Sequence, residues 1–118
     1  MKALIVDGTT EQSEAGRRIK EAATSLGMEV VVVTLREMNI NRCIGCFSCW
    51  IKTPGECALA DDGRKLPKEW ADTDLIIYVT PVFLGSYSPL LKKQLDRMIP
   101  VLLPYFKRFD RETHHPQR

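Results

Sequence analysis

The order of apolar and polar residues predicts a strand, a helix and a second strand in the first 35 residues. Residues 3–6 are continuously apolar and are followed by Asp7 and Gly8, as in a strand that is buried on both faces. A helical stripe follows, which Gly27 ends: Ala15, Ile19, Ala22, Ala23 and Leu26. Residues 30–35 are rich in β-branched side chains and predict the second strand. These three elements form a βαβ unit, whose crossover is almost always right-handed.

The pattern resumes after residue 65 and predicts one strand between two helices. A short helix is expected from about residue 66 to residue 70, and residues 75–80 predict a third strand. Ser88 and Pro89 have the residue types of an N-cap and of a first helical position. The helix that they begin is expected to end at Pro100 and to bury one stripe of side chains: Leu91, Leu95 and Met98. Alternating strands and helices of this kind place the chain in the α/β class.

Three segments lack this regular pattern. Residues 36–62 have no sustained period, and a loop of this length inside a compact domain is usually functional or disordered. Residues 99–106 are apolar but contain two prolines, which makes them a poor central strand. Residues 107–118 are predicted to be a mobile tail. The strand at 75–80 is therefore expected to have an open edge, which a partner chain, the tail or the rest of a longer protein could cover.

Length and charge narrow the class of protein. The chain has 118 residues, which predicts a single domain over residues 1–118. Its net charge of +2 is too small to indicate a nucleic-acid partner or an anionic membrane. The first apolar run is too short for a signal peptide, and no run approaches the length that spans a bilayer. We therefore expect a cytoplasmic protein without a membrane or nucleic-acid partner.

All four cysteines of the chain lie within residues 43–57: Cys43, Cys46, Cys49 and Cys57. This spacing is close to the runs that ligate iron–sulfur clusters in bacterial ferredoxins, although the last gap is longer. Structural zinc usually takes two separated cysteine pairs, and disulfides need an oxidising compartment. Cys46 and Cys49 also form a CxxC pair, in which the pKa of a thiol is often lowered. The residues thus leave three alternatives open: an iron–sulfur cluster, metal-free redox-active thiols, and zinc or structural cysteines.

Several segments resemble the iron–sulfur flavoproteins and NAD(P)H-dependent flavin reductases, which are flavodoxin-like proteins. The first, within residues 39–62, contains the four cysteines. The second, residues 71–88, is similar to the third strand and flavin loop of that family, and residues 91–97 to the helix that follows. The resemblance extends over residues 1–97. It implies a flavodoxin-like, doubly wound parallel sheet whose last strands are missing from this chain.

By this resemblance the chain holds FMN at the carboxyl ends of its strands. The implied phosphate contacts, in the loop after the first strand, are Thr9, Thr10 and Ser13. The implied contacts of the flavin ring, in the loop after the third strand, are Pro81, Val82, Phe83, Leu84, Gly85 and Ser86. The phosphate loop departs from the family pattern because it lacks the usual basic and Gly-Asn-Thr elements. Glu11 and Glu14 would in addition repel a phosphate. A plain helix start therefore stays open as an alternative for this loop.

The resemblance also implies that Cys43, Cys46, Cys49 and Cys57 hold a [4Fe–4S] cluster close to the flavin. The leading hypothesis is an FMN-dependent oxidoreductase or electron-transfer flavoprotein that is reduced by NAD(P)H. It would pass electrons to a redox partner or a small-molecule acceptor, and we expect it to be a homo-oligomer. The first alternative is a shortened, non-catalytic flavodoxin-like subunit or fragment that acts through protein–protein interaction. The second is a metal-free thiol redox protein.

Overall fold

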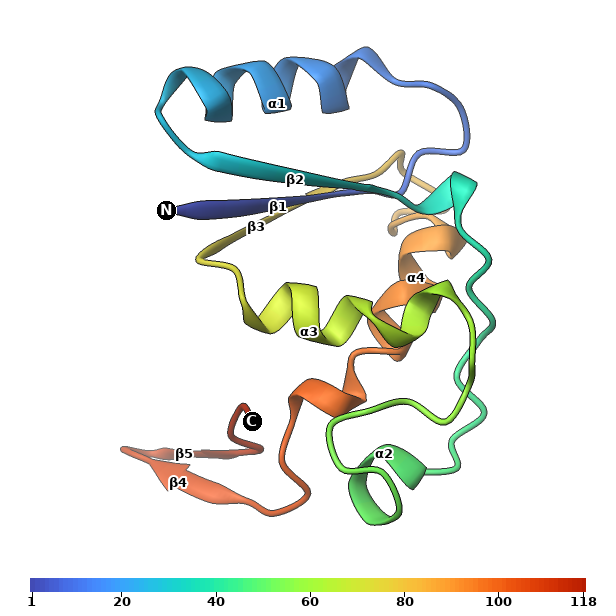
Figure 1. Ribbon diagram of the computed structural model, residues 1–118, viewed down its shortest axis with the longest axis vertical. Helices are drawn as coiled ribbons and strands as arrows, with labels where there is room; N and C mark the ends of the chain where they lie inside the picture. The colour runs from blue at the N-terminus through green and yellow to red at the C-terminus, as the bar shows by residue number, and fades with distance from the viewer.

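The computed structural model describes residues 1–118, and its centre is a parallel sheet of three strands. β1 (Lys2–Asp7) lies in the middle, between β2 (Glu29–Thr34) and β3 (Leu75–Val79) (Figure 1). β1 is buried from Ala3 to Asp7, as its continuous apolar run predicts. The strand order β2-β1-β3 is the beginning of the flavodoxin-like order. The predicted α/β fold class is therefore confirmed.

Helices cover both faces of the sheet (Figure 1). α1 (Glu14–Ser25) lies on one face, and the Ser13 side chain caps its first turn. α3 (Leu66–Ala71) and α4 (Pro89–Asp96) lie on the other face, close to where they were predicted. The buried core lies between the sheet and the elements on the side of α3 and α4. It consists of six side chains: Leu4, Val6, Leu35, Ile40, Leu66 and Leu91. None of the helices combines the length and the apolar character that crossing a membrane requires.

The segment between β2 and α3 is mostly irregular, as predicted. Three short helical pieces interrupt it: η1 (Leu35–Glu37), α2 (Ser48–Ile51) and η2 (Asp62–Arg64). The prediction that the last long helix ends at Pro100 is wrong, because α4 ends at Asp96. Pro100 lies instead in a separate turn, η3 (Ile99–Val101), whose first residues tolerate proline because they need no amide donor.

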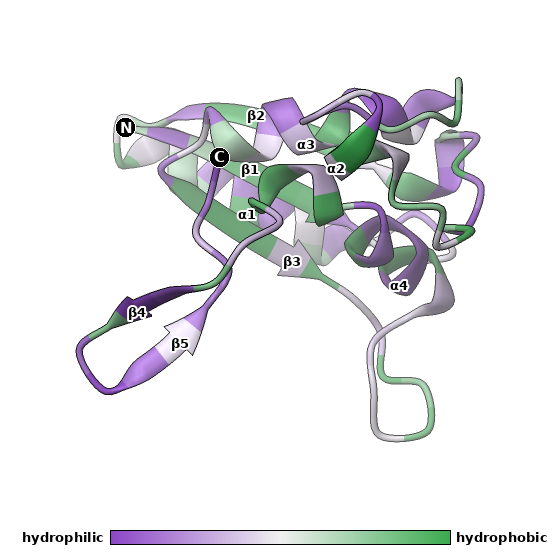
Figure 2. Cartoon of the chain, turned by 90° about the horizontal axis from the view of Figure 1, so that it is seen from below, coloured by the Kyte–Doolittle hydropathy of each residue, from purple (hydrophilic) through white to green (hydrophobic).

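The last twelve residues, predicted as a mobile tail, contain a β-hairpin. β4 (Lys107–Phe109) pairs antiparallel with β5 (Glu112–His114). Two backbone hydrogen bonds fasten the chain end: Leu103 N donates to Pro116 O (2.9 Å) and Arg118 N to Val101 O (2.7 Å). The hairpin stands apart from the main sheet (Figures 1 and 2). The outer edge of β3 therefore has no strand partner, as predicted.

Candidate functional site

Hydrogen bonds join the loop after β1 to the end of β3 and to the start of α4. The two predicted flavin-binding loops, after β1 and after β3, therefore lie close together. Gly8 N donates to Val79 O at the end of β3 (2.7 Å), and Ser88 Oγ donates to Gly8 O (2.6 Å). Ser88 is fully buried, and its hydroxyl also caps α4. The carboxyl ends of β1 and β3 thus lie together at the edge where doubly wound sheets bind ligands.

Gly8 permits this close approach. A Cβ at this position would lie 3.0 Å from Leu91 Cβ and 3.0 Å from Ser88 Oγ. We expect Gly8→Ala to displace the loop and to lower the free energy of unfolding by about 1–3 kcal/mol, the usual range for overpacking. Denaturant unfolding measures this effect, and a Gly8→Ala protein as stable as the wild type would contradict it.

Gly16→Ala is the matched control for this prediction. Gly16 lies in the first turn of α1 beside the same loop, but its Cβ would meet only the Asp7 side chain, at 3.5 Å, an ordinary contact. Alanine is also favoured over glycine within a helix. We therefore expect Gly16→Ala to leave the stability unchanged or to raise it.

A buried carboxylate, Asp7, lies at the base of the phosphate loop. Its Oδ1 accepts hydrogen bonds from the Thr9 amide (2.9 Å) and the Thr9 hydroxyl (2.5 Å). Its Oδ2 accepts from Arg36 Nη1 (2.9 Å). Burial alone raises the pKa of Asp7, but the Thr9 hydrogen bonds and the Arg36 ion pair together bring that pKa below its usual value. Asp7 is therefore ionised, and Arg36 balances its charge close to the predicted phosphate position.

The hydroxyl groups of the three predicted phosphate contacts differ in whether they already form hydrogen bonds within the protein. The Thr9 hydroxyl is engaged by Asp7, and the Ser13 hydroxyl accepts from Ala15 N (3.1 Å), whereas Thr10 is exposed. Arg36 Nη1 lies 3.2 Å from the Thr9 hydroxyl. The Thr10 hydroxyl, the amides that begin α1 and the Arg36 guanidinium together suit a phosphate group. The residues present thus fit FMN phosphate. The sequence did not indicate that Arg36 lies beside this loop.

The predicted flavin loop forms a tight turn that projects from the end of β3 (Figure 2). Phe83 and Ser86 exchange both backbone hydrogen bonds (2.8 Å each), so that Leu84 and Gly85 form the two-residue tip. Both tip residues have positive φ values, 46° and 79°, which glycine adopts without strain. Val82 and Leu84 are exposed by 80% and 107%. The loop therefore presents apolar side chains to solvent beside the joined strand ends.

The four cysteines line one small cavity at the other end of α4. Cys49 is buried on α2, Cys43 and Cys57 are half-buried, and Cys46 is exposed. Asp96 and Arg97, from the end of α4, line the same cavity. All four thiols are free. The structure therefore brings together the four residues that sequence spacing grouped.

The cysteine cavity is not a preformed metal cage. Its volume is about 20 Å³, room for about one water molecule. No three potential ligands in the structure are arranged as a metal site. Four thiols are nevertheless the donor set that iron–sulfur clusters use. The residues fit a cluster by their chemistry, provided that the loop, which has little regular structure, opens to admit it.

The thiols of this cavity differ in acidity. Burial, together with the neighbouring thiols, raises the pKa of Cys49. The hydroxyl and amide of Ser48 and the charge of Lys52 lower the pKa of exposed Cys46. Cys46 therefore becomes a thiolate more readily than Cys49 does.

A buried ion pair, which the sequence did not indicate, joins α4 to the end of the cysteine loop. Arg97 Nη2 and Nη1 each donate to one Asp61 oxygen, both at 2.8 Å, and the two side chains are 0% and 4% exposed. The Arg97 hydrogen bonds, and those from Asn41, hold the pKa of Asp61 far below its usual range despite burial. Asp61 also accepts from Gly63 N and caps η2.

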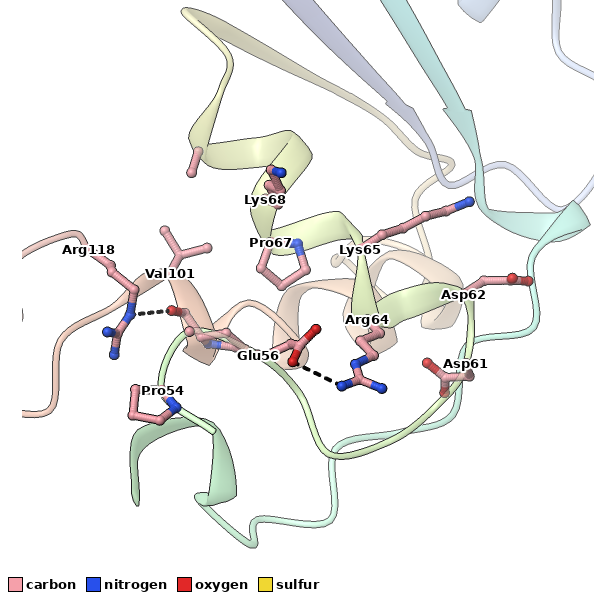
Figure 3. A pocket seen from close by; sticks show the side chains of 13 residues that line it. Pro54, Glu56, Asp61, Asp62, Arg64, Lys65, Pro67, Lys68, Val101 and Arg118 are labelled. Carbon is pink, nitrogen blue, oxygen red and sulfur yellow. Dashed lines mark hydrogen bonds and ion pairs between the residues drawn. The ribbon is translucent and has the colours of Figure 1, made fainter. Parts of the chain in front are cut away.

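A third cavity, of about 750 Å³, adjoins the cysteine cavity at Pro100 (Figure 3). It lies between residues 54–56, α3 and the chain end, and none of the predicted FMN or cysteine residues lines it. Glu56 and Arg64 point toward one another across it and form an ion pair (2.9 Å). Arg118 Nε donates to Pro100 O (3.3 Å). We assign no function to this cavity.

Comparison with known proteins relates nearly the whole chain to one family. Residues 1–113 match the family of NADPH-dependent FMN reductases. The chain is 29% identical, over 109 residues, to an iron–sulfur flavoprotein of Methanocaldococcus jannaschii, a match that covers 89% of this chain and 55% of that protein. It is 31% identical, over 104 residues, to an iron–sulfur flavoprotein of Archaeoglobus fulgidus, which covers 85% of this chain and 46% of that protein. The chain thus spans about half the length of the curated relatives that it matches.

Proposed function

Because this chain belongs to the NADPH-dependent FMN reductase family, we propose that it is an FMN-dependent oxidoreductase or electron-transfer flavoprotein that takes its electrons from NAD(P)H. The observation that carries this proposal is the joining of the β1 and β3 loops at the carboxyl edge of the sheet. Doubly wound sheets bind their ligands at this edge. The flavin would supply hydride and electron-transfer chemistry, and the protein would supply binding and orientation.

In this proposal the two loops have different roles toward FMN. The Thr10 hydroxyl, the amides that begin α1 and the Arg36 guanidinium bind the phosphate. The turn formed by residues 81–86 lies against the flavin ring, where the exposed side chains of Val82 and Leu84 exclude water. Asp7 holds Thr9 and Arg36 in position through the hydrogen bonds described above.

We further propose that Cys43, Cys46, Cys49 and Cys57 ligate a [4Fe–4S] cluster. Three relatives that match 82–89% of this chain are named iron–sulfur flavoproteins. The four thiols of this chain line one cavity. α4 separates this cavity from the flavin loop. Its eight residues give a helix about 12 Å long. The protein would therefore hold the two centres close together, at opposite ends of one rigid helix.

The visible absorption spectrum of protein purified without air tests this proposal. We expect flavin bands together with a broad shoulder from thiolate-to-iron charge transfer, and loss of the flavin bands on heating and filtration. Protein that stays colourless after incubation with FMN, iron and sulfide would overturn the proposal. Flavin bands without bound iron would overturn only the cluster.

A second candidate function is that of a flavodoxin-like subunit that acts by binding another protein. It is favoured by the unpaired outer edge of β3 and by exposed apolar side chains: Val82, Leu84, Tyr105 and Phe106. Light scattering combined with assays of FMN binding and NAD(P)H oxidation distinguishes this candidate, because a non-catalytic subunit should associate without either activity. A stable monomer that binds FMN and oxidises NAD(P)H would count against it.

A further inference from the structure

Arg97 is a buried cation beside the cysteine cavity. Its residue is 1% exposed, and it lines the same cavity as the four cysteines. Nη1 donates to Asn41 O (2.7 Å) at the start of the cysteine loop, and the guanidinium holds Asp61 at the end of that loop. One side chain therefore fixes both ends of the segment that carries the thiols.

The position of the guanidinium is closely restricted. The bidentate bond to Asp61 sets its plane. Gly63 lies against it, because a Cβ on Gly63 would be 3.3 Å from Arg97 Cζ. Arg97 therefore has little freedom to choose other partners.

One nitrogen of Arg97 is left without a partner. Nη1 and Nη2 have acceptors, but Nε is buried and has none. A buried donor without an acceptor costs about 1–3 kcal/mol, and such groups in native proteins call for an explanation. Cys57 lines the same cavity as Arg97 and is near enough to act on its guanidinium. The unpartnered donor and a predicted metal ligand are thus neighbours at one cavity.

This inference rests on the proposed function of the cysteines. We propose that the Arg97 Nε–H donates a hydrogen bond to the Cys57 sulfur when that sulfur is a metal-bound thiolate. A hydrogen bond to a ligand sulfur, with a positive charge behind it, withdraws negative charge and stabilises the reduced state of the centre. Arg97 is then a positioning residue that raises the reduction potential of the metal site.

The test must separate this role from a purely structural one, since loss of Arg97 alone leaves the Asp61 carboxylate buried without a countercharge. Two variants avoid that charge. Arg97→Lys keeps a cation for Asp61 but has no donor at the Nε position. The double variant Asp61→Asn with Arg97→Met has no buried charge at all. Arg64→Lys is the matched control, because Arg64 pairs with Glu56 next to Cys57 but is 41% exposed.

The measurement is a redox titration of the full chain after anaerobic reconstitution with iron and sulfide. We expect both Arg97 variants to retain iron and to show a lower midpoint potential. A tenfold change in the ratio of reduced to oxidised protein corresponds to about 59 mV for one electron. We expect the Arg64→Lys potential to equal that of the wild type.

Other results would refute either the proposed cluster or the role of Arg97. Wild-type protein that binds no iron would refute the proposed cluster, and the role of Arg97 with it. Iron-loaded Arg97 variants with the wild-type potential would refute the role of Arg97 alone, as would an equal shift in Arg64→Lys. If Arg97→Lys does not fold, the double variant decides by the same criterion.

Discussion

Replacing Asp61 by alanine is expected to lower the free energy of unfolding by about 3–5 kcal/mol, the usual result of removing one partner from a buried ion pair. The change leaves the Arg97 guanidinium buried without its bidentate acceptor. It also removes the acceptor for the Asn41 and Gly63 amides, so that the end of the cysteine loop loses its ion pair with α4. Urea unfolding monitored by tryptophan fluorescence measures the effect.

The control for this prediction is an exposed ion pair. Glu21 pairs with Arg17 on the surface of α1 (2.6 Å), with both side chains about 60% exposed. Glu21→Ala should lower the stability by only about 0.3–0.5 kcal/mol, as for other helix-surface pairs. Equal effects of Glu21→Ala and Asp61→Ala would contradict the buried ion pair.

The same pair predicts a dependence of stability on pH. The pKa of Asp61 lies far below its usual value of 3.8 in the folded protein, mainly because of the hydrogen bonds from Arg97. A carboxyl group with a depressed pKa stabilises the fold above its unfolded pKa, and this contribution is lost as the pH falls toward the folded pKa. The stability difference between wild type and Asp61→Ala should therefore be constant near neutral pH and shrink below about pH 4. A stability difference that shrinks between pH 8 and pH 6 would show that it does not come from the ionisation of Asp61.

The sheet could be predicted from the sequence because each strand is a continuous apolar or β-branched run that ends at a polar residue or a proline. Residues 3–6, 30–35 and 75–80 correspond to β1, β2 and β3 within one or two residues. The parallel pairing of the first two strands followed from the helix between them. The end of α4 was not predictable in this way. Pro100 sets a limit that the helix cannot pass, but the helix ends earlier, at Asp96.

The candidate site was predictable only where its residues are neighbours in sequence. The cysteines are grouped by spacing, so their common cavity could be anticipated. Asp61 precedes Gly63 and a short helix, which indicates a cap but not a partner. Arg97 is 36 residues away from Asp61, on a helix whose apolar stripe suggests that charged residues face solvent. Only the fold shows that these two charges meet.

The C-terminal hairpin was missed for a related reason. Its residues, among them Lys107, Arg111 and Glu112, are charged and exposed, which is typical of a disordered end. What fixes this segment is contact with distant residues. The Trp50 indole, on α2, donates to Leu102 O (3.0 Å) and packs against the His115 ring at a centroid distance of 5.2 Å. The segment 99–118 thus lies against the cysteine loop, which no local pattern could show.

Cys57→Ala is expected to remove most of the iron from reconstituted protein, because three thiolates leave one iron of a four-cysteine cluster open to solvent and oxygen. The loop from Cys43 to Cys57 contains only the four-residue helix α2, so part of its folding free energy should come from the metal. It should therefore become sensitive to protease in the variant, while FMN binding at the strand ends is retained. Ile51→Ala, at a 77% exposed position on α2, is the control and should keep its iron. A Cys57→Ala protein with the wild-type iron content would exclude Cys57 as a ligand, and with it the four-cysteine cluster.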